Sequence, residues 1–435
     1  MTPQEVTETA LAAAAGTELV VVVDELSSAY LRWTGDEVTS AADTDDRQLT
    51  VIALGGGTPG VAAARGALDP AGIRALIAAA RRARRPGSAA TPPPVTAVDP
   101  EWGRPPVPPA AVPARPRSHD HFLFGYAQQC ARTTYVASSA GLRRRYGEST
   151  ALLDQTLRSA GGAVTWTGWC GTDLAEAGYQ PPGDRMEAAR TRIALPPAAY
   201  EVLLSPSCVA DLMLRLYAAA DARDAAEGRT VFALPGGGTR LGERLSPAEL
   251  TLYSDPAEPG LSCAPFVVAR GTGTSSVYDN GLPLTRTNWI TDGVLTALVR
   301  DRGTAGATGE PATPEIGNLV LTGPAGGSSL AEMVGRTRYA LLVTALWYVR
   351  DVDRRTLRLT GLTRDGVYLV EDGRIRCAVN DFRFTASPVD VLGQVREVGR
   401  TEPALPREYG EHAIRTAMPA LRVADFVLSA VGDAR

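Results

Sequence analysis

The three histidines of the sequence are the first candidates for chemistry: His119, His121 and His412. Side chains two residues apart point to the same face of a strand, so His119 and His121 could bind one metal ion together. A zinc site needs three or four protein ligands, and no third histidine lies near this pair. Glu408 and His412 have the i, i+4 spacing of one helix face, which supplies only two ligands. We therefore predict no metal site in this chain, with metal binding by His119 and His121 as the weaker alternative.

The candidate nucleophiles and the candidate nucleotide-binding motif are predicted to have structural roles rather than catalytic ones. Cys208 opens an apolar stretch and is predicted to be a packed thiol. No G-x-S-x-G motif occurs, and so few histidines make a Ser-His-Asp triad improbable. Residues 55–60 match G-x-G-x-x-G, but the next helix begins only near Pro70, too late to meet a pyrophosphate. We predict a glycine-rich hairpin turn there and no catalytic residue in the chain.

Composition excludes several classes of protein. The 44 basic residues are all arginine, so neither a lysine Schiff base nor the lysine of a Walker A loop is possible. A net charge of −4 argues against nucleic-acid binding through bulk charge, and no apolar run reaches the roughly 18 residues of a membrane span. Five scattered cysteines without a CxxC pair argue against a disulfide scaffold and fit the reducing cytoplasm.

The 435 residues suffice for two or three domains, and the pattern predicts an α+β fold. Residues 1–195 are expected to form an N-terminal α/β domain, with strands at 19–23, 29–34 and 49–54. A helix begins at Asp69-Pro70, and a further helix is expected around residues 150–160. A connector at 86–117 holds 11 of the 32 prolines and is expected to be exposed to solvent.

The second unit, residues 196–435, is expected to be β-rich and largely antiparallel. Ser205-Pro206 should begin a helix with apolar residues on one face. After residue 230, short β segments alternate with Gly, Pro, Asp and Asn turns. The polar strings at 278–281 and 363–366 can be plain turns or ligand contacts, and the pattern alone leaves both open.

Several stretches resemble the TldD/PmbA family of metallopeptidases. They read PTPEIGNLVL (313–322), ALWYVRDVDRRTLRLTGLTRDGVYLVEDGRI (345–375), NDFRFTASPVDVL (380–392) and PALRVADF (419–426). SVYDNGLP (276–283) and YEVLLSPSCVADL (200–212) also fit, as do LRWTGDEVTS (31–40) and SSAGLRRR (138–145) more loosely. The likeness therefore extends over nearly the whole chain.

The resemblance implies a pair of subunits. In the TldD branch an HExxxH helix, with a further cysteine, binds zinc, and its glutamate acts as general base. The matching region here, residues 209–229, has no histidine, and none occurs between 121 and 412. The chain is thus similar to the PmbA (TldE) branch, whose zinc is expected in a TldD-like partner. Relatives trim peptides, and some occur in antibiotic biosynthesis.

These expectations combine into one hypothesis and one rival. The hypothesis is a cytoplasmic, non-metal subunit of a heterodimeric peptidase, which shapes a cleft for unfolded peptides or peptide-like intermediates and binds neither nucleic acid nor membrane. The rival is a stand-alone, possibly homodimeric carrier of a peptide-like metabolite. Arginine suits a peptide carboxylate or carbonyl. The predicted cleft residues are Arg364, Arg350, Arg383, Asp279 and Asn280.

Overall fold

The computed structural model describes residues 1–14, 16–55, 58–85, 92–111, 122–159, 164–177, 184–271, 273, 275–408 and 415–432. His119, His121 and His412 lie outside the described residues, so metal binding by this pair stays an untested alternative.

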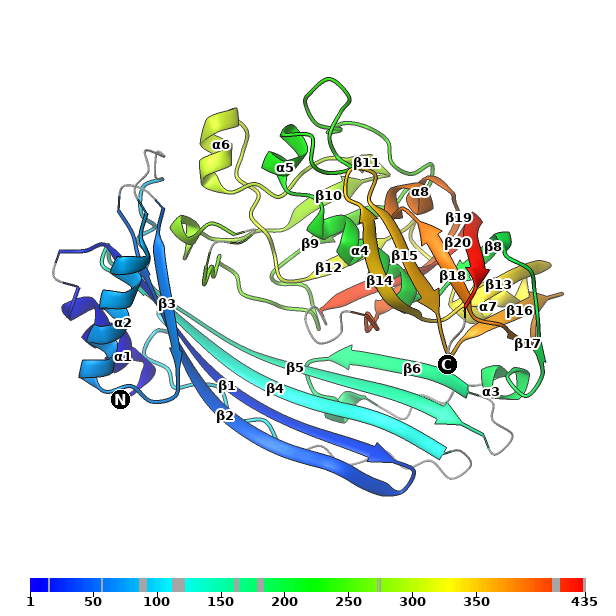
Figure 1. Cartoon of the computed structure of the whole chain (residues 1–435), viewed down its shortest axis with the longest axis horizontal. Helices are drawn as coiled ribbons and strands as arrows, with labels where there is room; N and C mark the ends of the chain where they lie inside the picture. The colour runs from blue at the N-terminus through cyan, green and yellow to red at the C-terminus, as the bar shows by residue number, and fades with distance from the viewer. Residues whose placement is uncertain are drawn as a thin grey trace.

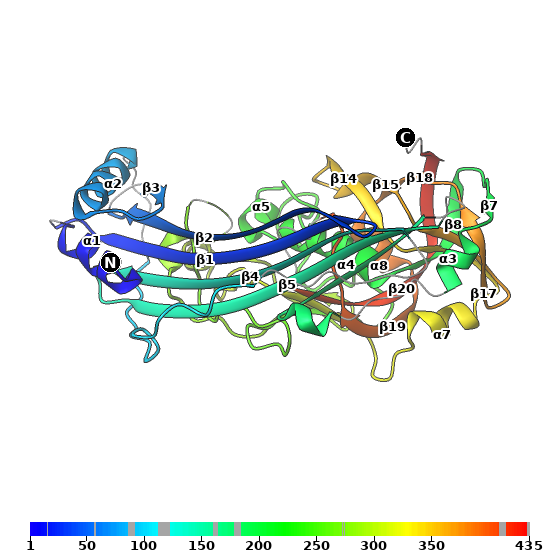
Figure 2. The same ribbon diagram turned by 90° about the horizontal axis from the view of Figure 1, so that it is seen from below.

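The N-terminal half folds into one six-stranded antiparallel sheet, with the strand order β3-β2-β1-β4-β5-β6. Figure 1 shows its long strands running beneath the rest of the molecule, and the turned view of Figure 2 agrees. The strands are β1 (Leu19–Thr34), β2 (Glu37–Ala53), β3 (Gly60–Arg65), β4 (Phe122–Ser138), β5 (Arg143–Arg158) and β6 (Val164–Gly171). The expected hairpin between β2 and β3 is confirmed.

The helix expected around residues 150–160 is wrong, because this segment belongs to β5. Its leucines have a spacing that also fits a helix, but here they divide between two buried faces of a strand. Leu153 and Leu157 pack with Trp33 on one face, whereas Leu152 packs with Leu405 on the other. A strand buried on both sides loses the simple alternation that identifies it in a sequence.

Two helices cover one end of this sheet, α1 (Pro3–Ala12) and α2 (Pro70–Ala83) (Figure 1). The predicted start of α2 is confirmed: the Asp69 carboxylate accepts a hydrogen bond from the backbone N–H of Gly72 at 2.7 Å. Ile73 and Ile77 of α2 pack with Val21 of β1 in a single buried cluster. Alternation along the strands then directs the neighbouring side chains, such as Val22, to the opposite face.

The C-terminal half covers that opposite face. At one end Val22 packs against Phe266 and Val267, and at the other Trp166 of β6 packs against Ala345 and Leu405. The connector also lies against the sheet, since the backbone N–H of Val107 donates to Thr133 Oγ1 at 2.8 Å.

A second sheet of fourteen strands forms the C-terminal half, and most of its pairs are antiparallel. The parallel pairs within the described residues are β12–β20, β13–β8 and β17–β7. Its strands are β7 (Arg192–Ile193), β8 (Ala198–Leu204), β9 (Thr251–Ser254), β10 (Thr287–Thr291), β11 (Val294–Leu295), β12 (Leu319–Thr322), β13 (Tyr339–Val343), β14 (Leu346–Asp353), β15 (Arg358–Thr363), β16 (Val367–Glu371), β17 (Arg374–Val379), β18 (Phe382–Ala386), β19 (Val395–Pro403) and β20 (Thr416–Val431). The predicted α+β fold with a β-rich second half is confirmed.

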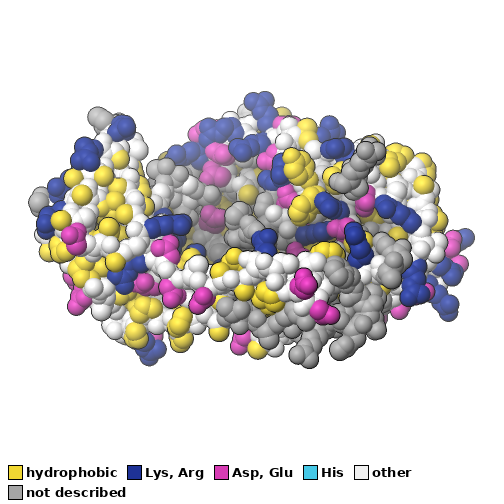
Figure 3. All heavy atoms as spheres, turned by 60° about the horizontal axis from the view of Figure 1, so that its bottom comes forward, with side chains coloured by type: hydrophobic (Ala, Val, Ile, Leu, Met, Phe, Trp, Pro, Cys, Tyr) yellow, Lys and Arg dark blue, Asp and Glu magenta, His cyan; other side chains and the backbone are white. Residues whose placement is uncertain are grey.

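Short helices connect these strands. They are η1 (Leu174–Glu176), α3 (Asp184–Ala188), α4 (Pro206–Ala218), α5 (Ala222–Ala226), η2 (Val277–Asp279), α6 (Arg302–Thr308), α7 (Leu330–Gly335) and α8 (Pro388–Gly393). Across the described ranges, none of the helices has the length and hydropathy to cross a bilayer. Basic and acidic side chains are interspersed over the face shown in Figure 3.

Candidate functional site

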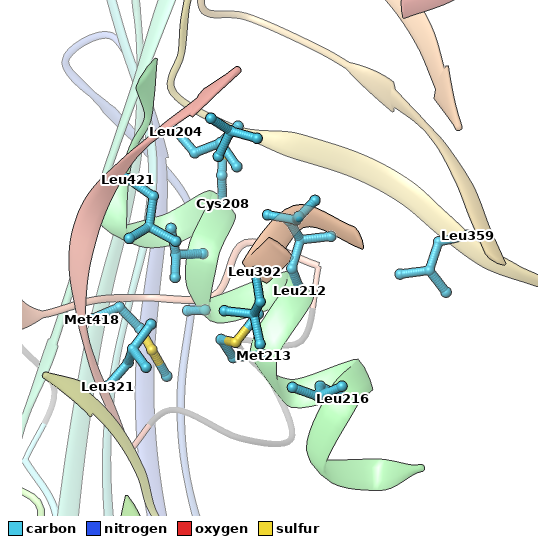
Figure 4. Packing of buried hydrophobic residues seen from close by; sticks show 14 of the residues in the cluster. Leu204, Cys208, Leu212, Met213, Leu216, Leu321, Leu359, Leu392, Met418 and Leu421 are labelled. Carbon is cyan, nitrogen blue, oxygen red and sulfur yellow. The ribbon is translucent and has the colours of Figure 1, made fainter. Parts of the chain in front are cut away.

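Helix α4 lies at the centre of the C-terminal core. Ser205 caps it as the sequence predicts, accepting a hydrogen bond from the backbone N–H of Cys208 at 3.3 Å. Figure 4 shows Cys208, Leu212 and Met213 of α4 among leucines from the surrounding strands and from α8. Burial raises the pKa of the Cys208 thiol to about 12, so it stays protonated. The prediction that Cys208 is a packed thiol is confirmed.

Helix α4 also carries a fully buried carboxyl group, that of Asp211. One carboxyl oxygen accepts a hydrogen bond from the backbone N–H of Glu408 at 3.0 Å, and Oδ2 has no hydrogen-bond partner within the described part of the chain. Burial raises the pKa of Asp211 well above its usual value, and the nearby Glu408 charge adds to the rise. This rise favours the protonated form, which is a weaker metal ligand and a weaker base than the carboxylate. Asp211 therefore acts as a hydrogen-bonding anchor for the segment that contains Glu408.

Glu408 in turn holds strand β14. Its Oε1 lies 2.7 Å from Nη1 of Arg350, and its Oε2 accepts the backbone N–H of Tyr348 at 2.8 Å. Tyr348 has a φ of 55°, a left-handed conformation that is unusual for an aromatic residue. The register of β14 shifts at this point, and the Tyr348 ring is 56% exposed beneath the Arg350 guanidinium. The chain from Asp211 through Glu408 thus fixes a strained bulge at the surface.

Beside this bulge, two arginines and two tryptophans form a tryptophan–arginine stack. Arg407, whose side chain is 8% exposed, lies 5.1 Å from the ring centroid of Trp166 and 5.3 Å from that of Trp347. Arg364 lies 5.6 Å from the Trp347 centroid. Both arginines pair with the Asp365 carboxylate, at 2.8 Å for Arg407 and 3.5 Å for Arg364. The stack joins β6 of the first sheet to β14 of the second.

A second carboxyl group lies behind the stack. Asp154 of β5 accepts a hydrogen bond from the indole N–H of Trp166 at 3.1 Å. Burial raises the pKa of Asp154, although the Arg407 charge and the Trp166 bond oppose the rise. This bond fixes the orientation of the Trp166 ring, and with it the position of Arg407.

Three of the five predicted cleft residues lie in this region. Arg350 and Arg364 border the bulge and the stack, as described above. Arg383 of β18 is in register with Leu362 of β15, which is in register with Trp347 of β14, so the three side chains share one face. Arg383 is exposed and has no ion-pair partner among the residues that the structure describes.

Asp279 and Asn280 lie elsewhere and are buried. Asp279 binds the Nε and the backbone N–H of Arg302, at 2.7 and 3.0 Å. The Asn280 amide bonds both the N–H and the carbonyl of Ala269. Both side chains thus use their hydrogen-bonding capacity inside the protein, which is the turn interpretation that the sequence left open. Their predicted contact with substrate or partner stays a prediction.

A cavity of about 1030 Å³ lies next to the stack, between the two sheets. Its walls come from β6, α3, the start of α4, α7, the start of β17 and residues 402–405. Trp166 belongs to both the cavity wall and the stack. The volume is at the upper end of the range of small-ligand pockets. Within the described parts of the chain, no three His, Cys, Asp or Glu side chains are grouped as a metal site would need.

The sequence analysis missed Asp211, Arg407 and the two tryptophans. Asp211 carried a usable signal, because an aspartate within an otherwise apolar helix must be neutralised or paired. Arg407 and Trp166 carried none, since they are distant in sequence and meet only through the packing of two sheets.

Residues 197–430, more than half of the chain, match the PmbA/TldA metallopeptidase C-terminal domain. The chain belongs to the TldD/PmbA family. The predicted resemblance is thereby confirmed. Helix α4, β14 and Arg407 all lie within the matched residues, whereas Trp166 and α3 precede them. No curated protein matches the sequence significantly.

Solved structures share the fold of this TldD/PmbA protein along its length. TldE from Thermococcus kodakarensis is 15% identical with a TM-score of 0.69, covering 95% of this chain and 96% of its own. A proposed DNA gyrase modulator from Thermotoga maritima is 15% identical with a TM-score of 0.70, covering 98% and 100%. Another from Bacteroides thetaiotaomicron is 14% identical with a TM-score of 0.70, covering 98% and 99%. Identities this low establish a common fold.

Proposed function

We propose that this chain is the non-metal, TldE-like subunit of a TldD/TldE-type metallopeptidase. A TldD-like partner supplies the zinc, and the two subunits enclose unfolded peptides or peptide-like biosynthetic intermediates. A cytoplasmic location goes with the proposal, because all five cysteines are free thiols.

The observation that carries this proposal is the chemistry of α4. The helix expected to hold zinc ligands in the TldD branch contains no histidine here, and burial raises the pKa of its acid, Asp211. The protonated form that this rise favours is a poor zinc ligand and a poor base for activating water. The fold of a TldE structure fits the same role.

The surface of β14 supports a role in holding an extended peptide. Within the described residues β14 pairs with no strand other than β15, although Glu408 and Arg215 bond the backbone of its bulge. Arg350, Arg364 and Arg383 lie on or beside this part of the sheet, and their guanidinium groups suit peptide carboxylates and carbonyls. Trp347 adds a partly exposed aromatic surface.

Co-expression with a TldD-type partner tests the proposal. Size exclusion should give a heterodimer, and elemental analysis about one zinc per heterodimer but none in the isolated chain. Hydrolysis of an unstructured peptide should require both subunits and stop on chelation. Stoichiometric zinc in the isolated chain, or partner-free hydrolysis that survives a chelator, would contradict the proposal.

The cavity of about 1030 Å³ favours a second candidate, a stand-alone binding protein for a peptide-like metabolite. Partner pairing separates the two functions. A chain that stays homodimeric in the presence of TldD-type proteins, and still binds a peptide-like ligand, is a carrier.

A further inference from the structure

Strand β14 departs from regular pairing at two places within its eight residues. Its register with β15 shifts once around Tyr348 and again at Val352, so β14 has one extra residue at each place. The side chains of Tyr348 and Val352 are 56% and 58% exposed, and Trp347 beside them is partly exposed. Figure 2 shows β14 at the margin of the C-terminal half. The two bulges therefore direct a patch of large apolar side chains to solvent, and we call Trp347, Tyr348 and Val352 the bulge surface.

The first bulge is held in place from inside the protein. The backbone N–H of Tyr348 donates to Glu408 Oε2 at 2.8 Å, and the Val349 carbonyl accepts a hydrogen bond from Arg215 Nη2 at 2.9 Å. A left-handed backbone is strained for an aromatic residue, and such strain persists only where the surrounding contacts impose it. The Tyr348 ring is thus fixed in an outward position before anything binds, which lowers the entropic cost of binding.

The same hydrogen bonds restrict what the bulge surface can bind. An extended strand adds to a sheet edge through free backbone N–H and C=O groups. At the first bulge the Tyr348 N–H and the Val349 carbonyl are already bonded, and the second bulge interrupts the ladder again. The bulge surface therefore presents side chains rather than backbone, which suits the surface of a folded protein. Tyrosine, tryptophan and arginine contribute most to such interfaces, and Trp347, Tyr348 and Arg350 are adjacent here.

The charges around the bulge surface favour an acidic partner over a second copy of the chain. From the start of β14 to Arg358 the sequence has four arginines and two aspartates. Asp351 pairs with an arginine of α4 at 3.3 Å, and Asp353 accepts a hydrogen bond from the Arg355 N–H at 3.0 Å. Arg355 and Arg358 are exposed and have no ion-pair partner in the part of the chain that the structure describes. An isologous contact would bring two positive patches together, whereas carboxylates would pair with both arginines.

We propose that the bulge surface docks the TldD-like subunit, which receives Tyr348 in an apolar pocket with carboxylates at its rim. The identity of this partner rests on the proposed function, whereas the surface itself rests on the residues above. The neighbouring sheet face, with Arg364 and Arg383, then remains for the peptide. Docking here would bring the partner directly beside that face.

The affinity of the full-length chain for a purified TldD-type subunit, measured by biolayer interferometry, tests the surface. Tyr348→Gly removes the ring and adopts a positive φ without strain. We expect the affinity to fall at least about tenfold while the melting temperature does not fall. A purely structural role of the ring would lower the melting temperature as well. Asp372→Gly is the matched control, because Asp372 has a φ of 47° at an exposed turn, and it should keep the affinity.

A charge reversal tests the acidic rim. Arg358→Glu should weaken binding at least about tenfold at low salt, and by less at high salt, because salt screens exposed charges. Arg74→Glu makes the same change at an exposed position of α2, away from β14 (Figures 1 and 2), and should leave the affinity unchanged. Unchanged affinity in both Tyr348→Gly and Arg358→Glu overturns the proposal. Equal losses in the two controls overturn it as well.

Other occupants of the bulge surface give different results. If the isolated chain is a homodimer that Tyr348→Gly dissociates, the surface binds a second copy. If the Tyr348→Gly pair assembles normally but has a higher KM for an unstructured peptide, the surface binds substrate. Either result overturns the proposal, and so does a wild-type chain that does not bind the TldD-type subunit.

The peptidase assay separates this proposal from the proposed function. Zinc-dependent hydrolysis by a pair that assembles independently of the bulge surface would keep the proposed function and overturn the docking surface. A pair that requires the bulge surface but hydrolyses no peptide would refute the proposed function and keep the docking surface.

Discussion

The raised pKa of Asp211 leads to a quantitative prediction for Asp211→Asn. Asparagine keeps the oxygen that accepts the Glu408 N–H, and it carries no charge at any pH. The substitution therefore preserves the anchor and removes only the ionisation. If Asp211 is protonated in the folded protein at neutral pH, the variant should be more stable than the wild type there.

The size of the effect follows from linkage. In the unfolded chain Asp211 ionises near its ordinary pKa of 3.8, whereas burial keeps it protonated to a higher pH in the folded chain. Between these two pKa values the folded state binds one more proton, so wild-type stability falls by about 1.4 kcal/mol per pH unit as the pH rises. Asp211→Asn lacks this loss. Its stability advantage should therefore grow at that slope and level off above the folded pKa.

Urea unfolding of both proteins from about pH 5 to about pH 8 measures this difference, because other ionisable groups cancel in the subtraction. Asp425→Asn, at an exposed position on β20, controls for the general loss of one negative charge. A difference that is flat over this range, or a variant less stable than the wild type throughout, would show that Asp211 is ionised in the folded protein. Asp211 would then be available as a base or ligand, and the argument from α4 would fail.

Three other substitutions test the site and the fold. Arg364→Ala should abolish turnover of the reconstituted pair but cost less than about 1 kcal/mol of stability, because its ion pair is partly exposed. If the heterodimer dissociates in proportion to the loss of turnover, Arg364 has a structural role instead. Arg407→Ala should lower the free energy of unfolding by about 2–4 kcal/mol, because it leaves a tryptophan pair and a carboxylate without their buried cation; a urea midpoint like that of the wild type would contradict the stack. Gly125→Ala should cost about 1–3 kcal/mol by displacing the Trp33 ring, and unchanged tryptophan fluorescence together with unchanged stability would argue against that packing.

The local sequence was sufficient to predict the helices that begin with a capping side chain followed by a proline. Asp69 and Ser205 each begin a helix because a short polar side chain can accept a hydrogen bond from a backbone N–H three residues later, followed by a proline suited to the first turn. The β-rich second half followed from the frequency of turn residues. The long stretch at 345–375 was specific enough to indicate the family, which the domain match confirms.

The secondary structure of segments buried on both faces could not be predicted from the local sequence pattern. Residues 150–158 of β5 have a leucine spacing that fits a helix, and only the helices on one side and the C-terminal half on the other make them a strand. Arg364 pairs with its own sequence neighbour, contrary to the expectation for a regular strand, because Asp365 takes a left-handed conformation with a φ of 55°. Hydrophobic patterns identify one buried face, and they are ambiguous when both faces are buried.

The sequence by itself determined the fold class, the family and the absence of a histidine on α4, since each depends on residue identity and near-neighbour spacing. Only the tertiary structure decided that burial raises the pKa of Asp211, that Arg407 lies near both Trp166 and Trp347, and that Trp166 borders a cavity. These properties depend on burial and on contacts between residues some 200 or more positions apart, as for Arg407 and Trp166 across two sheets. Desolvation is a property of the packed interior and cannot be computed from neighbours along the chain.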